Sequence, residues 1–315
     1  MTALPGPVAV LGFGNQGAAQ AANLRDSGLE VRLGLRPGGR SEAAARAQGF
    51  ATFAPADALR GARTVAMLVP DEVMPALWAE IGGALEPGAC VVFAHGYALL
   101  HGGLGFRADA DVVLVSPTGP GRVVRQLFER GQGLPAYLAV HADGSGHAWE
   151  RAGAYANALG CGRARLWRTT VREETEVDLF GEQAVLCGGM NALVLAAFET
   201  LVAAGYSPEI AYLECVHQLK YLADLLHERG IDGLRHGISS TALFGDVTRG
   251  PRVIGEAARA AMAQALAEIR DGTFARELAA EMAAGRPASR RALERGTASP
   301  IEAARRRALG LPEGA

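Results

Sequence analysis

The chain has 315 residues, of which 49% are hydrophobic and 20% charged, and its net charge is −2. This composition is typical of a globular protein long enough for two domains, and the near-neutral charge gives no reason to expect a nucleic-acid or membrane-surface partner. No apolar run approaches the roughly 20 residues that span a bilayer, and the N-terminus lacks the basic region of a signal peptide. The four cysteines (Cys90, Cys161, Cys187 and Cys215) have no C-x-x-C spacing, which indicates reduced core residues in a cytoplasmic protein.

A glycine-rich motif close to the N-terminus predicts a dinucleotide site. An apolar run at 8–11 is predicted as a strand and precedes a G-x-G-x-x-G, which in turn opens a predicted helix over 16–27. Glycines at these positions permit a tight turn and close approach of a pyrophosphate, which the helix N-terminus then binds. The motif alone is a weak signal, but the strand before it and a second predicted strand at 31–35 supply the expected context. The candidate cofactor-binding residues are Gly12, Phe13, Gly14, Asn15, Gln16 and Gly17.

The loop after the second predicted strand favours NADPH over NADH. An acidic residue there would bind the ribose 2′-hydroxyl of NAD, whereas this chain has Arg36, Arg40 and Ser41. Two guanidinium groups and a hydroxyl suit a 2′-phosphate, because arginine binds phosphate through two hydrogen bonds. The alternative is a solvated basic loop with no ligand.

Further strands alternate with helices, which predicts a mainly parallel sheet. The chain therefore begins with a Rossmann-like, doubly wound α/β domain over 1–169. His95 follows one of these strands and so lies where such sheets bind ligands, although a histidine at a strand end is also a common structural hydrogen-bonding group. The remaining strands are predicted at 64–69, 90–94, 112–115, 135–140 and 164–167, with a helix near 145–159.

Strand signals disappear after residue 169, and the rest of the chain, 170–315, is predicted to be all-α. Thr170 and Glu173 fit a capping box at the start of a long helix. A second helix is predicted to begin at Ser207-Pro208 and to run to about Glu228.

Two carboxylates share one face of the helix that begins near Thr170. Asp178 and Glu182 are four residues apart, and the apolar residues Val177, Leu179, Val185 and Leu186 place much of the helix in a core. Buried carboxylates need a partner or a metal, so this pair indicates a divalent cation held by oxygen ligands. The alternative is a solvated acidic stripe, which is the interpretation for Glu173, Glu174 and Glu176.

Residues 173–189, EETEVDLFGEQAVLCGG, resemble the signature of the ketol-acid reductoisomerases in their short, class I form. That family converts 2-acetohydroxy acids to 2,3-dihydroxy acids with NADPH and Mg²⁺ in branched-chain amino-acid biosynthesis. Matching segments at 214–218, 238–242 and 271–275 extend the resemblance over nearly the whole chain. It implies a small-molecule substrate, a knotted helical C-terminal domain and a homodimer whose sites use residues of both subunits.

The resemblance assigns roles to individual residues. His95, in an A-H-G context, is the implied catalytic histidine and assists proton transfer through water. Asp178, Glu182 and Glu214 are the implied metal-binding and catalytic acids, and Ser239 contacts the substrate carboxylate.

The loops after the strands add three implied cofactor-binding residues: Asp71, Val73 and Gly121. Without the resemblance, Glu214 alone would be interpreted as a surface residue of a helix.

The chain departs from the family pattern at two chemically decisive positions. Thr118 stands where the family's P-K-G-P-G has lysine, and Gln218 stands where its E-C-L-H-E ends in a second glutamate. In the family, that lysine and that glutamate both act on the charge of the substrate oxygens during alkyl migration. An acid–base group of this kind typically contributes about 10² to 10⁴-fold in rate. The leading hypothesis is an NADPH-dependent reductase of a C=O or C=N bond in a 2-oxo or 2-imino acid-like substrate, without efficient migration. In that case Asp178 and Glu182 bind Mg²⁺, or a substrate ammonium or iminium group instead.

Two alternatives remain open from the sequence. The chain is either a genuine Mg²⁺-dependent ketol-acid reductoisomerase that tolerates both substitutions, or an inert NADPH-binding regulatory homologue.

Overall fold

The computed structural model describes Leu4 and residues 6–312. These residues form two compact units, 1–177 and 178–315. The division falls inside one long helix, so the first turns of that helix belong to the sheet unit, whereas the sequence-based boundary at 169/170 precedes it.

The first unit is built on an eight-stranded sheet of order β3-β2-β1-β4-β5-β6-β7-β8. Every neighbouring pair is parallel except β6 and β7. The strand order reverses between β1 and β4, so the loop after β1 lies at the switch point where doubly wound sheets bind ligands. The Rossmann-like prediction is confirmed. The strands are β1 Val8–Leu11, β2 Val31–Gly34, β3 Ala51–Phe53, β4 Thr64–Met67, β5 Cys90–Phe93, β6 Asp111–Pro117, β7 Ala136–Asp143 and β8 Leu166–Arg168.

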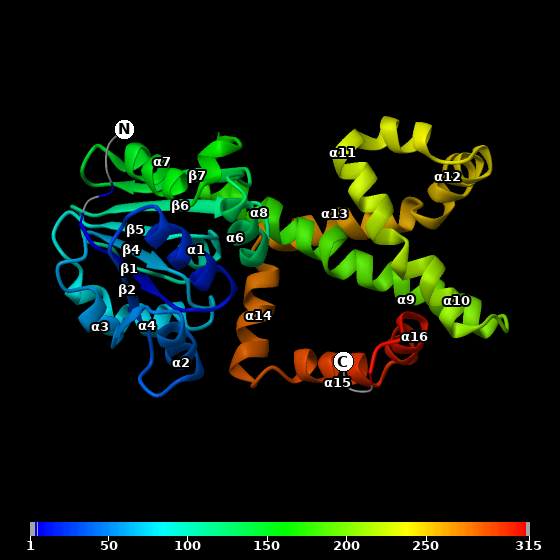
Figure 1. Cartoon of the computed structure of the whole chain (residues 1–315), viewed down its shortest axis with the longest axis horizontal. Helices are drawn as coiled ribbons and strands as arrows, with labels where there is room; N and C mark the ends of the chain where they lie inside the picture. Colours follow the sequence, from blue (N-terminus) through cyan, green and yellow to red (C-terminus); the bar gives the residue numbers. More distant parts are fainter. Residues whose placement is uncertain (1–3, 5, 313–315) are drawn as a thin grey trace. The chain divides into compact units, whose positions relative to one another are not determined.

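Helices cover both faces of this sheet (Figure 1). One face packs on buried residues of α1 and α7, and the other on buried residues of α3, α4 and α5. The central strands β1, β4 and β5 are buried throughout, as expected for parallel strands covered on two sides. The helices of this unit are α1 Asn15–Asp26, α2 Arg40–Ala47, α3 Pro55–Ala58, α4 Met74–Ile81, α5 Tyr97–His101, α6 Gly121–Glu129 and α7 Ala148–Ala158, with short 3₁₀ turns at Gly82–Ala84 and Cys161–Arg163.

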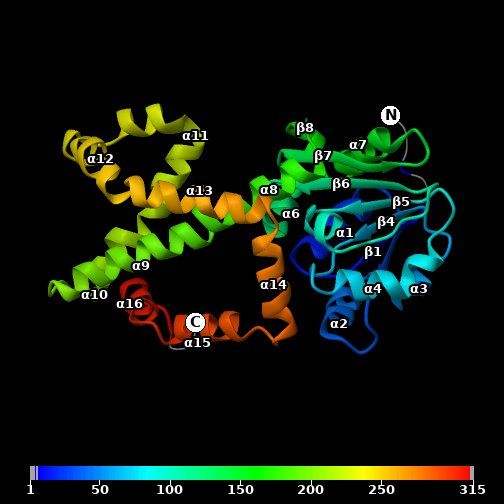
Figure 2. The ribbon, with the colours of Figure 1, turned by 180° about the vertical axis from the view of Figure 1, so that it is seen from behind.

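The second unit is entirely helical over its described residues (Figure 2). It starts within α8, and its small core lies where α9 and α10 meet the final helix α16. The helices are α8 Val171–Gly181, α9 Gly188–Ala203, α10 Pro208–Tyr212, α11 Leu219–Gly237, α12 Ser240–Val253, α13 Glu256–Arg270, α14 Thr273–Ala283, α15 Pro287–Ala298 and α16 Pro300–Leu309.

Two π-helical segments interrupt this helical unit. Glu182–Leu186 joins α8 to α9, and Leu213–His217 joins α10 to α11. In each segment one N–H bonds the carbonyl five residues back, from Cys187 to Glu182 at 3.0 Å and from Gln218 to Leu213 at 3.2 Å. The helix predicted from Ser207 to about Glu228 is present, with Ser207 as its N-cap and a non-helical residue at Gly230, but it contains the second π segment, which was not predicted. Each π segment begins at or beside a candidate site acid, and such segments occur frequently at functional sites.

The apolar residues of the acid-bearing helix do not form a core within the chain. Val177, Val185 and Leu186 are 58%, 56% and 60% exposed, and only Leu179, at 8%, is buried. The prediction that they are core residues was wrong for three of the four. Helical periodicity identifies an apolar surface, but it does not reveal whether the same chain covers that surface.

The same helical stretch, Val171–Ala203, is the one described segment long and apolar enough to cross a membrane, with a mean hydropathy of 1.8 in its most apolar window. A single stretch of this kind is weak evidence for a span, and this one carries Asp178 and Glu182. The cysteine prediction also needs a correction, because Cys90 and Cys161 are buried but Cys187 is exposed and Cys215 only half-buried. All four thiols are free.

Candidate active site

The glycine-rich loop forms an open cradle after β1. Gly12 has φ of 102°, and a side chain there would meet the Leu68 carbonyl oxygen at 2.5 Å. A Cβ on Gly17 would lie 2.4 Å from the Gly12 oxygen, so the helix packs directly on the turn. Beside Gly14, in contrast, a Cβ would meet nothing within 4 Å. The loop thus combines tight internal packing with open space at the N-terminus of α1, and a pyrophosphate fits there.

The other predicted residues of this loop have distinct placements. The Phe13 side chain is buried and packs edge-on against Phe50, so it supports the loop from within the core. Asn15 is exposed at the first turn of α1. Gly121 begins α6, and a Cβ there would lie 2.0 Å from the Asn15 carbonyl oxygen, so the two loops touch backbone to backbone.

The loop after β2 presents the groups expected to bind a 2′-phosphate. Arg36, Arg40 and Ser41 are all exposed, and within the described part of the chain none of their side chains makes a hydrogen bond or ion pair. Glu42 stabilises the loop: it accepts a hydrogen bond from the Gly38 N–H at 2.6 Å and forms an ion pair with Arg46 at 2.7 Å. Glu42 is thus already paired, and both predicted guanidinium groups remain available.

Polar groups gather where β4 and β5 end. Asp71 and Val73 lie in the turn after β4, closed by a hydrogen bond from the Val73 N–H to the Pro70 oxygen at 2.9 Å. Burial and the Asp71 charge raise the pKa of Tyr97, which keeps this phenol protonated. The Tyr97 ring lies nearly parallel to the His95 imidazole, with 6.5 Å between centroids.

His95 pairs with a buried carboxylate that the sequence interpretation treated as solvated. Glu174, on α8, is 3% exposed; its Oε1 lies 3.3 Å from His95 Nδ1, and its Oε2 accepts the Gly96 N–H at 2.9 Å. A Cβ on Gly96 would lie 2.2 Å from Thr175 Oγ1, so the absence of a side chain there lets α8 approach. The acidic-stripe interpretation was therefore wrong for Glu174. The available signal was its spacing, since Glu174, Asp178 and Glu182 recur every four residues.

The start of α8 follows the prediction in part. Thr170 Oγ1 accepts the Glu173 N–H at 3.0 Å, as an N-cap does. The return half of the capping box is missing, because the Glu173 carboxylate accepts a hydrogen bond from the Thr169 hydroxyl instead.

The candidate metal-binding acids do not form a complete donor set in one chain. Asp178, Glu182 and Glu214 are all exposed. Among the described residues no group of three or more His, Cys, Asp or Glu side chains is placed to hold a metal ion. A Mg²⁺ site on these acids stays a prediction.

Ser239 is the N-cap of α12, and its Oγ accepts the Ala242 N–H at 3.2 Å. A capping serine keeps its own O–H as a donor, and the N-terminus of a 14-residue helix favours a negative group. This placement suits the predicted contact with a substrate carboxylate.

Thr118 and Gln218, the two residues that depart from the family pattern, are both neutral. The Thr118 hydroxyl and N–H both donate to the Pro135 carbonyl, at 2.9 and 3.0 Å, so the side chain is bound to the backbone just before β7. Gln218 is exposed directly after the second π segment.

A cavity of about 370 Å³ in the sheet unit is lined by Glu174, the partner of His95. Tyr137 and Trp167 on the neighbouring strands β7 and β8 form its apolar side, opposite the first turns of α8. Its remaining lining residues are Arg168, Thr169, Glu173 and Val177.

A dinucleotide cradle at the switch point of a doubly wound sheet, beside a histidine paired with a carboxylate, defines a nicotinamide-dependent oxidoreductase. Residues 6–165 match the family described as "Acetohydroxy acid isomeroreductase, NADPH-binding domain", and residues 171–309 match "Ketol-acid reductoisomerase, C-terminal domain". The chain therefore belongs to the ketol-acid reductoisomerase family.

Individual relatives agree with this assignment. The ketol-acid reductoisomerase (NADP(+)) of Xylella fastidiosa (strain 9a5c) is 48% identical over 94% of this chain and 85% of its own length. That of Xanthomonas campestris pv. campestris (strain B100) is 50% identical over 89% of this chain and 84% of its own length. The solved structure of an NADH-preferring ketol-acid reductoisomerase from an uncultured archean is 36% identical, with a TM-score of 0.94 over 98% of this chain and 95% of that one.

Proposed function

We propose that this NADP-dependent member of the family reduces a C=O or C=N bond of a 2-oxo or 2-imino acid-like substrate without efficient alkyl migration. Thr118 carries this proposal, because a hydroxyl engaged with Pro135 stands where the family motif has a lysine. The migration step develops charge on the substrate oxygens, and a fixed cation there stabilises that charge. Hydride transfer to a carbonyl also places charge on the oxygen, but proton transfer from His95 can neutralise it without a cation at position 118.

The cofactor half of the site supports reduction. When bound, NADPH supplies the hydride. The open space at Gly14 accepts its pyrophosphate, while Arg36 and Arg40 are free to bind its 2′-phosphate.

His95 and Glu174 are suited to proton transfer next to the hydride. The carboxylate at Nδ1 fixes the imidazole orientation and stabilises the positive charge that the ring gains on protonation. Because Glu174 also accepts the Gly96 N–H, its position does not depend on His95 alone. The pair thus delivers a proton to the oxygen formed when a carbonyl is reduced, directly or through water.

The acids of the helical unit position the substrate in this proposal. Ser239 and the N-terminus of α12 bind a carboxylate, and Glu214 lies in the π segment Leu213–His217. We infer that the active molecule is a cytoplasmic homodimer with sites shared between subunits. This inference is supported by the exposed apolar face of Val177, Val185 and Leu186 and by the incomplete donor set of one chain. No step is assigned to Mg²⁺.

The second candidate is a genuine ketol-acid reductoisomerase. It is favoured by relatives of that name at 48% and 50% identity and by the retention of Asp178, Glu182 and Glu214. In that case neutral Thr118 and Gln218 replace one cation and one anion together, so the net charge of the site is preserved.

One assay separates the candidates. NADPH absorbance is followed with 2-acetolactate and, separately, with 3-hydroxy-3-methyl-2-oxobutanoate, the already rearranged intermediate, each with and without Mg²⁺. The proposal expects turnover of the second compound, or of cyclic and N-substituted imino acids, and little of the first. Rapid turnover of 2-acetolactate would establish the reductoisomerase, and NADPH binding without turnover of any oxo or imino acid would refute both.

A further inference from the structure

A buried chain of hydrogen bonds joins α7 to the loop after β6 through the dinucleotide helix α1. The Tyr155 hydroxyl donates to Gln20 Oε1 at 2.9 Å, Gln20 Nε2 to Gln16 Oε1 at 3.0 Å, and Gln16 Nε2 to the Gly119 carbonyl at 2.9 Å. We call these four residues the amide relay. Tyr155 and Gln20 are 0% exposed, so water does not replace the bond between them, whereas the bonds of Gln16 are partly buried.

The relay has only one self-consistent direction. The Gly119 carbonyl can only accept, so Gln16 must present its NH₂ there and its oxygen to Gln20. Gln20 must then donate through its own NH₂ and offer its oxygen to Tyr155, which must donate. The Gly119 carbonyl thus sets the orientation of both amides, and the phenol supplies the donor that the Gln20 oxygen needs to keep its place in the chain.

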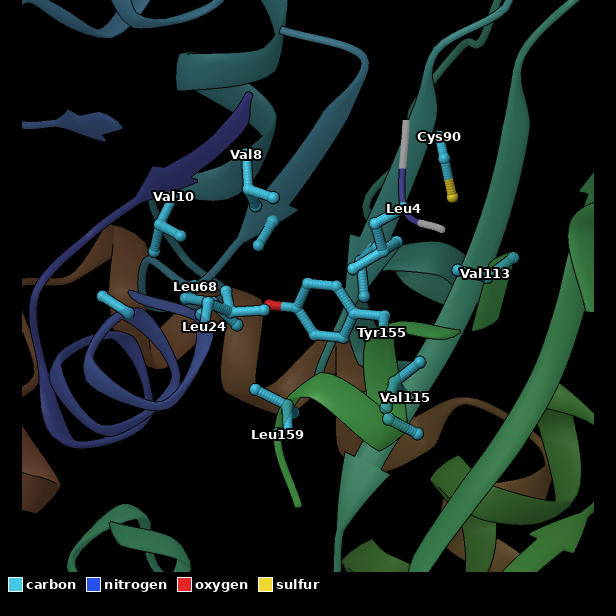
Figure 3. Packing of buried hydrophobic residues seen from close by; sticks show 14 of the residues in the cluster. Leu4, Val8, Val10, Leu24, Leu68, Cys90, Val113, Val115, Tyr155 and Leu159 are labelled. Carbon is cyan, nitrogen blue, oxygen red and sulfur yellow. The ribbon is translucent and has the colours of Figure 1, made fainter. Parts of the chain in front are cut away.

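The environment of Tyr155 keeps it a donor. Burial raises the pKa of its phenol far above the ordinary value, so the proton is retained. Figure 3 shows the ring within the core of the sheet unit and its hydroxyl directed toward Leu24 on α1 and Leu68. In this apolar surrounding Gln20 is the group that satisfies the hydroxyl, and a lost partner would leave a buried polar atom unpaired.

The far end of the relay supports the cofactor site. Gly119 lies between Thr118 and Gly121, and Gly121 already touches the backbone of Asn15. The Gln16–Gly119 bond therefore joins the loop over 118–121 to the glycine-rich loop, which contains Gln16 itself. This junction is distinct from the Arg36–Arg40 loop, which follows β2.

We propose that Tyr155 and Gln20 are positioning residues for the pyrophosphate and nicotinamide half of NADPH. They hold the Gln16 amide so that the two loops stay joined, although neither residue lies at the surface that contacts the cofactor. This inference uses the family's NADPH site and is independent of which substrate the enzyme reduces.

The test compares two ligands in the full-length protein by calorimetry. NADPH spans both halves of the site, whereas adenosine 2′-monophosphate carries only the adenosine and the 2′-phosphate and has no phosphate for the glycine-rich loop. Tyr155→Phe should raise the Kd of NADPH about five-fold, the effect of one lost hydrogen bond, and leave that of the fragment within about two-fold. The matched control is Tyr212→Phe, a buried tyrosine of the helical unit, which should change neither. Equal weakening of both ligands by Tyr155→Phe, or no weakening, would overturn the proposal.

A double-mutant cycle protects the test against a general loss of stability. Gln20→Met keeps the length of the side chain but breaks the relay, so adding Tyr155→Phe to it should weaken NADPH no further. If the two substitutions weaken NADPH binding additively, the residues act separately and the relay plays no positioning role. The readout is NADPH affinity, so inactivity toward every substrate tested would not affect the outcome.

Discussion

The predicted cofactor loops of the sheet unit are held by packing within that unit, whereas the candidate acids of the helical unit are exposed to solvent. The glycine loop, the Gly121 contact and the buried Glu174 are all fixed by packing within residues 1–177. Asp178, Glu182 and Glu214 are exposed instead, next to large apolar side chains that are more than half exposed. If the proposed homodimer forms, cofactor binding should depend on the fold of one chain and substrate chemistry on assembly.

The largest expected effect comes from a substitution that impairs catalysis in the sheet unit and leaves assembly unchanged. Glu174→Gln should lower kcat for NADPH oxidation about 100-fold, because a neutral amide cannot stabilise the imidazolium of His95. NADPH affinity should stay unchanged, since Glu174 lies outside the glycine and arginine loops. Glu173→Gln, the exposed neighbour on α8, is the control. A kcat within about three-fold of the wild type would show that Glu174 takes no part in the chemistry.

Restoring the two missing charges tests the substrate half. Thr118→Lys with Gln218→Glu should raise 2-acetolactate turnover about 100-fold, the scale of one acid–base group, while each single change leaves an unbalanced charge and gives less. Turnover is measured by NADPH oxidation with Mg²⁺. Unchanged turnover in the double variant would mean that other residues limit the migration step.

The 2′-phosphate contact is the next largest expected effect. Arg36→Ala or Arg40→Ala should each lower the NADPH over NADH preference in kcat/KM by about ten-fold, because each removes a charge-assisted hydrogen bond. Arg46→Ala, on the same helix α2 as Arg40 but paired with Glu42, serves as the control. An unchanged ratio in both variants would favour the solvated-loop interpretation.

Assembly itself is tested on the exposed face of the helical unit. Leu186→Lys, at a position 60% exposed in the chain, should convert the proposed dimer to a monomer in light scattering, because a charge would be buried in the interface. NADPH binding should survive and substrate turnover should not. Phe53→Lys, on the edge strand β3, is the control, and a monomeric wild type would contradict the proposed homodimer.

The smallest expected effect concerns pH. Arg307 lowers the pKa of Glu209 from 4.5 to about 2 in the folded state, so the pair stabilises the fold above the unfolded value and is lost as pH falls from about 4.5 toward 2. The pair is exposed, so the change in Tm across this window should be only about 1–2 °C. Glu209→Gln should remove that part of the pH dependence, and an identical pH profile would show that the pair contributes nothing.

Local features were predictable from the sequence and long-range ones were not. The glycine loop, the basic loop after β2 and the Thr170 cap depend on neighbouring residues, and the structure has all three. Glu174 was misjudged because its burial depends on Gly96, 78 residues away in the chain. The three-residue edge strand β3 was not predicted, since its partly exposed sequence, ATF, gives no alternating signal.

The sequence also gave no sign of the π segments, because no side-chain pattern distinguishes them from a regular helix. Similarly, an apolar stripe such as Val177 and Leu186 looks the same whether one chain or two bury it. This ambiguity explains why the acid pair was expected in a core.

The π segments have a consequence for how these helices tolerate insertions and deletions. A turn closed by a five-residue hydrogen bond holds one residue more than an α-helical turn, so it advances every later side chain by about 100° around the axis. Removing one residue from Glu182–Leu186 or Leu213–His217 would restore a regular helix with all its backbone hydrogen bonds. It would also rotate the side chains after the deletion about the helix axis relative to those before it. We expect a single-residue deletion there to leave a folded, helical and inactive protein, whereas the same deletion in the middle of α13 would mainly affect stability.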